Sequence, residues 1–120
     1  MSKIITLPTH QNLTGKISVI EKKISFKIKR VYFIYDIKGD RGGHRHKKNK
    51  QLLVCLNGSC DLLVINKKKK FKKLYKLKKN NKCILLEPDD WHKMINIKKG
   101  TIFLVIASEY YNKGDYIYYE

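Results

Sequence analysis

The chain has 120 residues, of which 42% are hydrophobic and 11% aromatic, and it carries a formal net charge of +17. This length and composition predict one globular domain over residues 1–120 and exclude a disordered chain. No apolar run approaches the roughly 20 residues that span a bilayer, and residues 1–8 lack the apolar segment of a secretory signal. Three cysteines without CxxC spacing argue against a disulfide framework and a structural zinc site, so we expect reduced thiols in a cytoplasmic protein.

The positive charge comes from lysine rather than arginine. Of the 27 basic residues, 24 are lysines, and the exceptions are Arg30, Arg41 and Arg45. Direct contacts with bases and phosphates favour arginine because its planar fork donates two hydrogen bonds at once. We therefore interpret the lysine excess as a solvated surface and do not expect nucleic acid as the partner. A small polyanionic substrate, attracted by the positive electrostatic field of the protein, remains an alternative.

In chain order, the sequence predicts short strands separated by turns, with little helix. The predicted strands cover residues 4–7, 16–21, 31–35, 51–56, 60–65, 71–77, 83–86, 91–97 and 102–108. Turn residues such as Asn57-Gly58 separate them. The lysine-rich stretch 67–77 predicts an outer hairpin with one wet face. Many short strands at regular spacing predict an all-β sandwich, jelly roll or small barrel.

Residues 41–46, Arg-Gly-Gly-His-Arg-His, are the most informative segment for function. If they form a strand, His44 and His46 project to the same face, because strand side chains alternate. Two imidazoles on one face can hold a metal or move protons. The alternative is structural, with both histidines acting as polar residues of a glycine-rich turn.

Two separate elements match cupin signatures. His44, His46, Gln51 and Gly58 fit most of the first one, and the segment from Pro88 through His92 to Asn96 resembles the second. Metal-binding cupins place a glutamate where this chain has Gln51, and a neutral amide is a poorer ligand for divalent metals. Two functional interpretations remain: a metal held by the three histidines, or metal-free acid–base chemistry by the imidazoles.

Longer motifs resemble one family within the RmlC-like cupins, the WxcM-like nucleotide-sugar 3,4-ketoisomerases. They lie at residues 28–36 (Ile-Lys-Arg-Val-Tyr-Phe-Ile-Tyr-Asp), 41–47, 91–92 and 107–117. Two departures stand out: Arg45 replaces a residue that is usually small, and the turn at residues 12–15 lacks an arginine that many relatives carry. The resemblance implies a cupin-type double-stranded β-helix, or jelly roll, that forms a homodimer by exchanging N-terminal strands.

The resemblance also implies an isomerase that moves the carbonyl of dTDP-4-keto-6-deoxy-D-glucose from C4 to C3. The reaction needs no cofactor and no metal, and it serves the biosynthesis of dTDP-3-amino-3,6-dideoxyhexoses. The implied catalytic residues are His44 as the base, His46 as its partner and Tyr35 as a hydroxyl near the sugar. The candidate substrate-binding residues are polar or aromatic side chains within or beside these motifs: Arg41, Arg30, Lys48, Gln51, Trp91 and His92.

Three other functions compete with this one. A dTDP-sugar epimerase of the related cupins would invert a carbon centre without moving the carbonyl. A metal-dependent cupin would use the same histidines as ligands. A non-catalytic module would use the basic surface or the barrel for binding alone.

Overall fold

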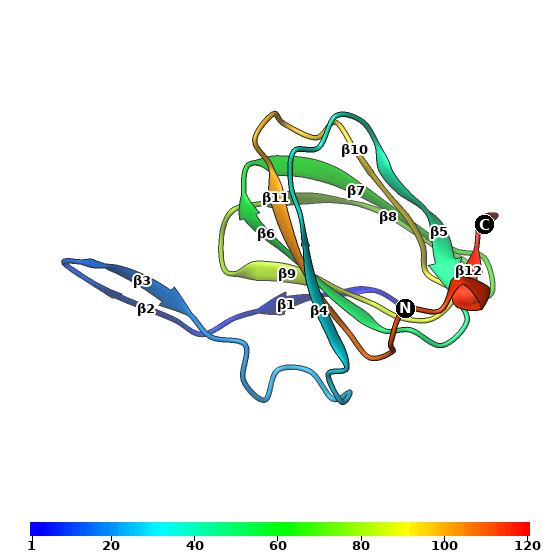
Figure 1. The fold of residues 1–120 in the computed structure, drawn as a ribbon, viewed down its shortest axis with the longest axis horizontal. Coiled ribbons are helices and arrows are strands. Elements are labelled where there is room, and N and C mark those ends of the chain that lie inside the picture. The colour runs from blue at the N-terminus through cyan, green and yellow to red at the C-terminus, as the bar shows by residue number, and fades with distance from the viewer.

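The computed structural model describes residues 1–120 and consists almost entirely of antiparallel strands (Figure 1). The only helical element is a single 3-10 turn, η1 (Lys113–Asp115). The strands are β1 (Lys3–Thr6), β2 (Thr9–Asn12), β3 (Gly15–Ser18), β4 (Arg30–Ile34), β5 (Arg41–His46), β6 (Gln51–Asn57), β7 (Ser59–Asn66), β8 (Phe71–Lys78), β9 (Lys82–Leu86), β10 (Trp91–Ile95), β11 (Ile102–Ala107) and β12 (Tyr116–Ile117). The predicted all-β class is confirmed.

Two five-stranded sheets form the barrel. One has the strand order β1-β9-β6-β11-β4 and the other β12-β5-β10-β7-β8. The β2–β3 hairpin extends away from the barrel as an arm (Figure 1). This arrangement is the jelly roll that the sequence predicts, and it places the histidines of β5 in the second sheet, facing the first. No helix in the structure has the length and apolar character that crossing a membrane requires.

The main core lies between the two sheets. Alternation along β7 buries every second residue, and Leu62 and Val64 are fully enclosed beside Phe103 of β11. Strand β6 is apolar on both faces because its outer face also packs, against a second cluster that includes Leu7 and Ile106. Residues 20–26 contribute Ile20 and Phe26 to the cover of that cluster. The continuous apolar run 52–56 is therefore a doubly buried strand.

The structure contains three strands that hydrophobic patterning did not predict: β2, β5 and β12. Strand β5 meets the condition set for residues 41–46, that they form a strand. Strand β2 has the sequence Thr-His-Gln-Asn and is exposed throughout, so it carries no apolar signal. It forms because the Asn12 side chain accepts hydrogen bonds from the backbone N–H groups of Thr14 and Gly15, which turns the chain back on itself. Strand β12 has only two residues and pairs with β5 alone.

Two glycines at the start of β5 shape the backbone beside the histidines. Gly42 and Gly43 have φ angles of +87° and +81°, which side chains disfavour. A Cβ on Gly42 would lie 2.8 Å from the His92 carbonyl oxygen, so only glycine allows β5 to approach β10 this closely. The pairing register shifts at this point, from His92 opposite His44 to Lys93 opposite Gly42. The bulge sets His44 directly beside His92.

Candidate active site

A cavity of about 240 Å³ lies between the two sheets, and its lining includes Tyr116 near the chain's C-terminus. Its polar lining comes from strands far apart in the sequence. The contributing residues are Arg30 and Tyr32 of β4, Arg41 and His44 of β5, Gln51 of β6, His92 of β10 and Tyr116 of β12. No carboxylate lines the cavity, and two guanidinium groups do, so it is suited to an anionic ligand.

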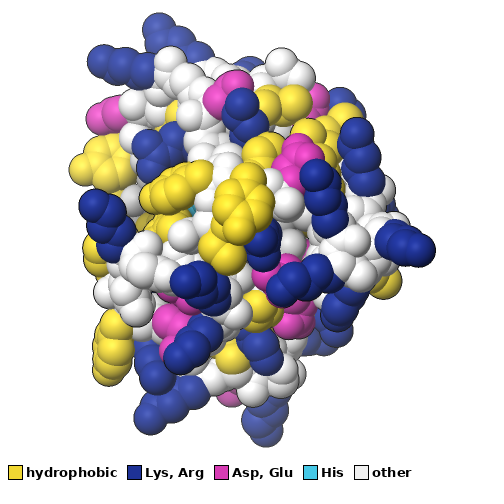
Figure 2. All heavy atoms as spheres, turned by 90° about the vertical axis from the view of Figure 1, so that its right-hand side faces the viewer, with side chains coloured by type: hydrophobic (Ala, Val, Ile, Leu, Met, Phe, Trp, Pro, Cys, Tyr) yellow, Lys and Arg dark blue, Asp and Glu magenta, His cyan; other side chains and the backbone are white.

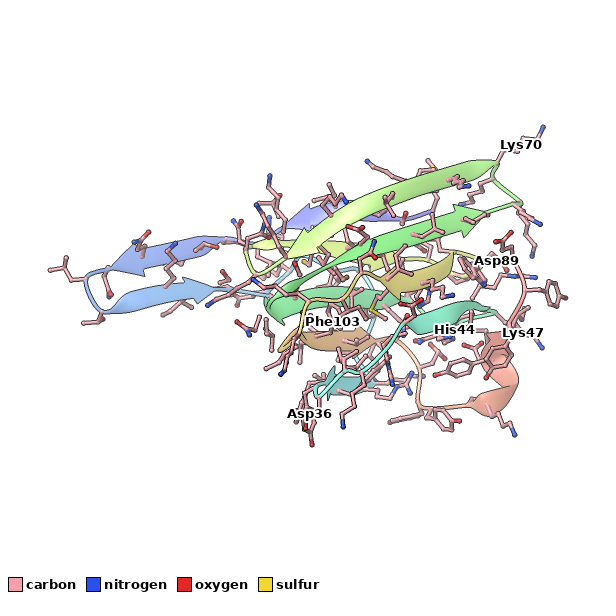
Figure 3. All side chains as sticks on the ribbon, turned by 90° about the horizontal axis from the view of Figure 1, so that it is seen from above. Asp36, His44, Lys47, Lys70, Asp89 and Phe103 are labelled. Atoms are coloured by element: carbon pink, nitrogen blue, oxygen red, sulfur yellow. The ribbon has the colours of Figure 1, made fainter.

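His44 is at the centre of an aromatic cluster. Its ring centroid lies 5.0 Å from that of His46, 4.8 Å from that of His92 and 4.8 Å from that of Tyr116. His44 lines the cavity, whereas His46 is only 3% exposed and lies behind it. Figure 3 places the His44 side chain beside the C-terminal segment. A ligand in the cavity therefore touches His44 and reaches His46 only through its neighbours.

Both buried histidines are oriented by hydrogen bonds. His46 Nδ1 donates to Asp115 Oδ2 at 3.0 Å, and the same carboxylate accepts from the backbone N–H groups of Lys48 and Asn49. His92 Nδ1 donates to the Asp90 carbonyl oxygen at 3.0 Å. Because a carboxylate and a carbonyl only accept, each neutral ring keeps its lone pair on Nε2. The buried Nε2 of His46 has no protein partner, so it is free to receive a proton.

The surroundings keep the imidazoles neutral. Burial, with the neighbouring His92 adding to the effect, lowers the pKa of His44 to about 4. Burial also lowers the pKa of His46 to about 4, with His44 adding to the effect, while Asp115 opposes it. The pKa of His92 falls to about 4 mainly because the ring is buried. All three histidines are thus uncharged near neutral pH, the form in which an imidazole acts as a base.

The same three histidines can also hold a metal ion. One ligand nitrogen from each ring lies within 4.8 Å of the other two. Their hydrogen bonds to Asp115 and to the Asp90 carbonyl are of the kind that orients metal-binding histidines. Gln51, at the position of the acidic cupin ligand, instead donates from Nε2 to the Tyr32 hydroxyl at 3.0 Å. The donor set is therefore three imidazoles without a carboxylate.

Tyr32 and Arg30 form the wall of the cavity on β4. The Arg30 guanidinium lies over the Tyr32 ring at 4.9 Å, and its buried Nε has no hydrogen-bond partner in the protein. The Tyr32 hydroxyl accepts a hydrogen bond from Gln51, so its own proton remains available to a ligand. Burial raises the pKa of Tyr32, which keeps the phenol protonated.

Six of the nine residues singled out from the sequence lie together in this site: His44, His46, His92, Arg30, Arg41 and Gln51. The placement of Tyr35 is a correction. Alternation along β4 turns Tyr32 inward, so Tyr35 points outward, is 58% exposed and stacks on Phe33. Figure 3 shows the next residue, Asp36, well away from His44.

Trp91 and Lys48 are likewise absent from the cavity lining. Trp91 precedes His92 on β10, and neighbouring strand residues face opposite sides, so an inward His92 turns Trp91 away. The Lys48 side chain is exposed, and only its backbone N–H contributes, by donating to Asp115 at 2.8 Å.

Sequence reasoning missed three residues of the site: Tyr32, Asp115 and Tyr116. The strand pattern would have predicted Tyr32 as a site residue if the inward face of β4 had been known. Asp115 and Tyr116 lie about 70 residues after His46 and reach it through the two-residue strand β12. The sole sequence signal for them is the Asp-Tyr-Ile stretch 115–117, which belongs to the family motif near the C-terminus.

A jelly roll with two histidines on one strand and a third on the neighbouring strand, all at the barrel mouth, defines the protein as a cupin. The RmlC epimerase structure from Legionella pneumophila agrees at the level of fold, with a TM-score of 0.83 at 16% identity, covering 97% of this chain and 71% of that one. The family model described as FdtA, WxcM-like, C-terminal matches residues 1–120. The chain belongs to this FdtA family, and the resemblance seen in the sequence is confirmed.

Two relatives within the family are close along nearly the whole chain. A TDP-4-oxo-6-deoxy-alpha-D-glucose-3,4-oxoisomerase of Aneurinibacillus thermoaerophilus is 39% identical over 120 residues, covering 97% of this chain and 85% of that protein. The solved structure of a histidine-to-asparagine mutant of the QdtA 3,4-ketoisomerase from Thermoanaerobacterium thermosaccharolyticum contains TDP-4-keto-6-deoxyglucose. It is 33% identical with a TM-score of 0.90, covering 98% of this chain and 86% of that one.

Proposed function

We propose that this protein is a sugar 3,4-ketoisomerase that converts TDP-4-keto-6-deoxyglucose into its 3-keto isomer. The observation that carries the proposal is a neutral His44 lining the cavity, with His46 and Asp115 behind it. The activity printed for the relative from Aneurinibacillus thermoaerophilus supports it, as does the substrate bound in the QdtA structure. The product is the keto sugar that a 3-aminotransferase accepts.

The chemistry requires a base and a proton donor but no redox cofactor. The C4 ketone acidifies the proton on C3, so a base removes it, and the electron pair forms a C3–C4 double bond while the C4 oxygen takes up negative charge. A proton then returns to C4 while the C3 hydroxyl loses its proton to become the new ketone, and the C4 oxygen takes up a proton to become a hydroxyl. Atoms and electrons balance within the sugar, because each proton removed is replaced.

His44 is the base in this proposal, and His46 is its partner in moving the proton. His44 touches the cavity, its ring lies 5.0 Å from that of His46, and both are neutral near pH 7. Asp115 orients His46 and stabilises the imidazolium that forms transiently, as a carboxylate behind a histidine base does. We assign the oxyanion donor to Tyr32, whose hydroxyl proton is free, in place of Tyr35.

Arg30 and Arg41 are the candidate diphosphate ligands. Both line the cavity, and no acidic side chain competes with them there. The guanidinium fork of each can donate two hydrogen bonds to phosphate oxygens. Gln51 fixes the Tyr32 hydroxyl, and His92 packs against His44, so we assign both of these residues to positioning.

A metal-dependent reaction is the second candidate, because the three imidazoles converge within 4.8 Å. The proposed proton transfer runs without a metal. Protein dialysed against excess chelator and freed of metal, as measured by elemental analysis, should retain full turnover. Loss of turnover on chelation, with recovery on adding one divalent metal per chain, would establish the metal-dependent alternative instead.

Dimerisation through the N-terminal arm is also part of the proposal. Strand β1 pairs with β9 of its own chain, whereas every residue of β2 and β3 is exposed and Leu13 at the tip is fully so. Because the rest of its own chain does not cover this hairpin, we expect it to be the element that two copies exchange. Light scattering should give a dimer, and Leu13→Ser with Ile17→Ser should shift it toward monomer; a wild-type monomer contradicts this part. The three unpaired cysteines support a cytoplasmic location.

The direct test is a coupled assay with TDP-4-keto-6-deoxyglucose and a 3-aminotransferase, followed by identification of the amino sugar. We expect a 3-amino sugar with wild-type protein and none with folded His44→Asn. Lys76→Ala, which removes an exposed lysine of β8 from its pair with Asp61, is the control and should retain activity. A product that keeps its C4 carbonyl would indicate an epimerase. Full turnover in His44→Asn would refute the assignment of the base.

A further inference from the structure

Arg45 is the residue between the two histidines of β5, and its side chain lies on the opposite face of the strand. Arg45 does not line the cavity, so nothing in the proposed chemistry accounts for it. Its side chain is nevertheless only 12% exposed, which is unusual for arginine. A long cation enclosed to this degree is held by specific partners.

The guanidinium joins two segments that lie far apart in the sequence. One nitrogen donates to a carboxylate oxygen of Asp89, in the loop between β9 and β10. Nε donates to the Tyr119 carbonyl oxygen at 3.1 Å, and the Tyr119 ring lies 5.2 Å from the guanidinium carbon. The planar guanidinium makes both hydrogen bonds and lies over the Tyr119 ring at the same time, whereas lysine would place one compact ammonium there.

The segment that Arg45 holds is the short C-terminal strand and the residues after it. Strand β12 has two residues and pairs only with β5, with Ile117 opposite Arg45 and Tyr116 opposite His46. The ion pair between Lys67 and Glu120 at the end of this tail is exposed and spans 3.6 Å. A two-residue strand at the edge of a sheet has little pairing of its own, so the Arg45 contacts hold residues 118–120 in place.

This tail forms part of the site. The Tyr116 ring lies 4.8 Å from that of His44 and 4.5 Å from that of His46, and it lines the cavity. Figure 2 looks onto this end of the molecule, and the little histidine colour that it shows lies among hydrophobic side chains. Figure 3 shows Asp89 and His44 at the same end, beside the C-terminal segment.

We propose that Arg45 is a positioning residue that clamps the C-terminal tail to β5 through Asp89 and Tyr119, and so fixes Tyr116 against His44 and His46. The clamp acts through the tail and makes no contact with the substrate. Its kinetic consequence rests on the proposed ketoisomerase function, whereas its structural consequence, the immobility of residues 116–120, does not.

Two variants test the clamp from its two sides. Arg45→Ala removes the guanidinium, and Asp89→Asn removes the carboxylate that holds it without touching the tail. Asparagine also tolerates the left-handed backbone of residue 89, where φ is +70°. Hydrogen exchange of the C-terminal peptide, followed by mass spectrometry, should be about tenfold faster in both variants. The double variant should be no faster than Arg45→Ala, because the two residues act as one unit.

The kinetic readout separates positioning from general stability. In both variants kcat should fall about tenfold while KM changes less than about threefold, because misplacing a neighbour of the reacting groups costs rate more than binding. Lys68→Ala is the matched control: it removes the other cation on Asp89, 70% exposed and 3.0 Å away, and should alter neither measurement.

Unchanged exchange in the C-terminal peptide of either folded variant overturns the clamp, whatever the activity is. Faster hydrogen exchange with an unchanged kcat would overturn the role of Arg45 in catalysis and leave it only a structural role in holding the tail. If wild-type protein shows no ketoisomerase activity, the exchange measurement still decides the clamp, so the two proposals fail separately.

Discussion

Asp115 provides the sharpest test of how the histidines work together. Its carboxylate is 8% exposed and accepts three hydrogen bonds, from His46 Nδ1 and from the backbone N–H groups of Lys48 and Asn49. Replacing it with asparagine keeps the size and removes the charge. The new amide nitrogen then faces either the Lys48 N–H, or His46 Nδ1 together with the Asn49 N–H. In both orientations the charge that stabilises a protonated His46 is lost.

The size of the effect follows from the contact that is lost. A hydrogen bond to a charged group contributes about 1.5–3 kcal/mol, and if it is expressed in the transition state, kcat falls by about 10- to 150-fold. Asp115 does not line the cavity, so KM should change by less than about threefold. The carboxylate raises the pKa of His46 against the effect of burial, and Asp115→Asn should therefore lower that pKa further below about 4.

Steady-state kinetics and imidazole nitrogen NMR check the two consequences together. In wild-type protein the His46 spectrum should show the proton on Nδ1, and in Asp115→Asn that preference should weaken, because a neutral amide oxygen is a poorer acceptor than a carboxylate. Asp61→Asn is the matched control, because Asp61 bonds Lys76 and Asn96 on the outer surface, and its kcat should stay within about twofold of wild type. A folded Asp115→Asn protein with wild-type kcat and an unchanged tautomer would refute the relay.

Three further predictions concern the site and its stability. Tyr32→Phe should reduce kcat about tenfold by removing an oxyanion donor, whereas Tyr35→Phe should have no effect; equal losses would contradict the inward assignment of β4. The pKa of His92 is about 4 in the folded protein and 6.5 in the unfolded chain, so the unfolded state binds a proton first as the pH falls below 6.5. This residue alone should therefore make the free energy of unfolding, measured with urea, about 2 kcal/mol lower at pH 5 than at pH 7. In His92→Asn the difference between pH 5 and pH 7 should shrink by about that amount, and the part due to His44 and His46, whose pKa values are also about 4, should remain. A wild-type stability that does not change between pH 5 and pH 7 would refute this prediction. Gly58→Ala would place a Cβ 2.2 Å from Thr101 Oγ1 at a φ of +79° and should destabilise the fold by about 1–3 kcal/mol in the same assay, a cost that Gly39→Ala, in open space, should not show.

The strands of the barrel were predictable because their signal is local. The apolar run at 52–56 and the alternation at 60–65 correspond to β6 and β7 within one or two residues. The same-face placement of His44 and His46 also followed, because strand geometry alone decides it. Where the apolar signal was missing, as in β2, side-chain hydrogen bonds of the turn supply the structure, and hydrophobic patterning does not detect them.

Which face of a strand points inward was the harder question, and it explains why Tyr35 and Trp91 lie outside the cavity lining. The sequence of a single strand such as β4 is compatible with either of its two faces pointing inward. Only its pairing with β11 in the closed barrel turns Tyr32 inward. Trp91 and His92 are neighbours on one strand, so only one of them can face the cavity. Strand alternation alone does not decide which one. Asp115 was not predicted as a site residue, because its approach to His46 depends on the C-terminal segment returning across the barrel to pair with β5.

The most direct test of the central claim uses TDP-4-keto-6-deoxyglucose labelled with carbon-13 at C4, incubated with the protein in deuterated water. Carbon NMR should show the labelled carbon change from a carbonyl to a carbon bearing a hydroxyl group and a solvent deuteron, while an unlabelled carbonyl appears at C3. A labelled carbon that stays a carbonyl, with deuterium entering only at a neighbouring carbon, would contradict the ketoisomerase account.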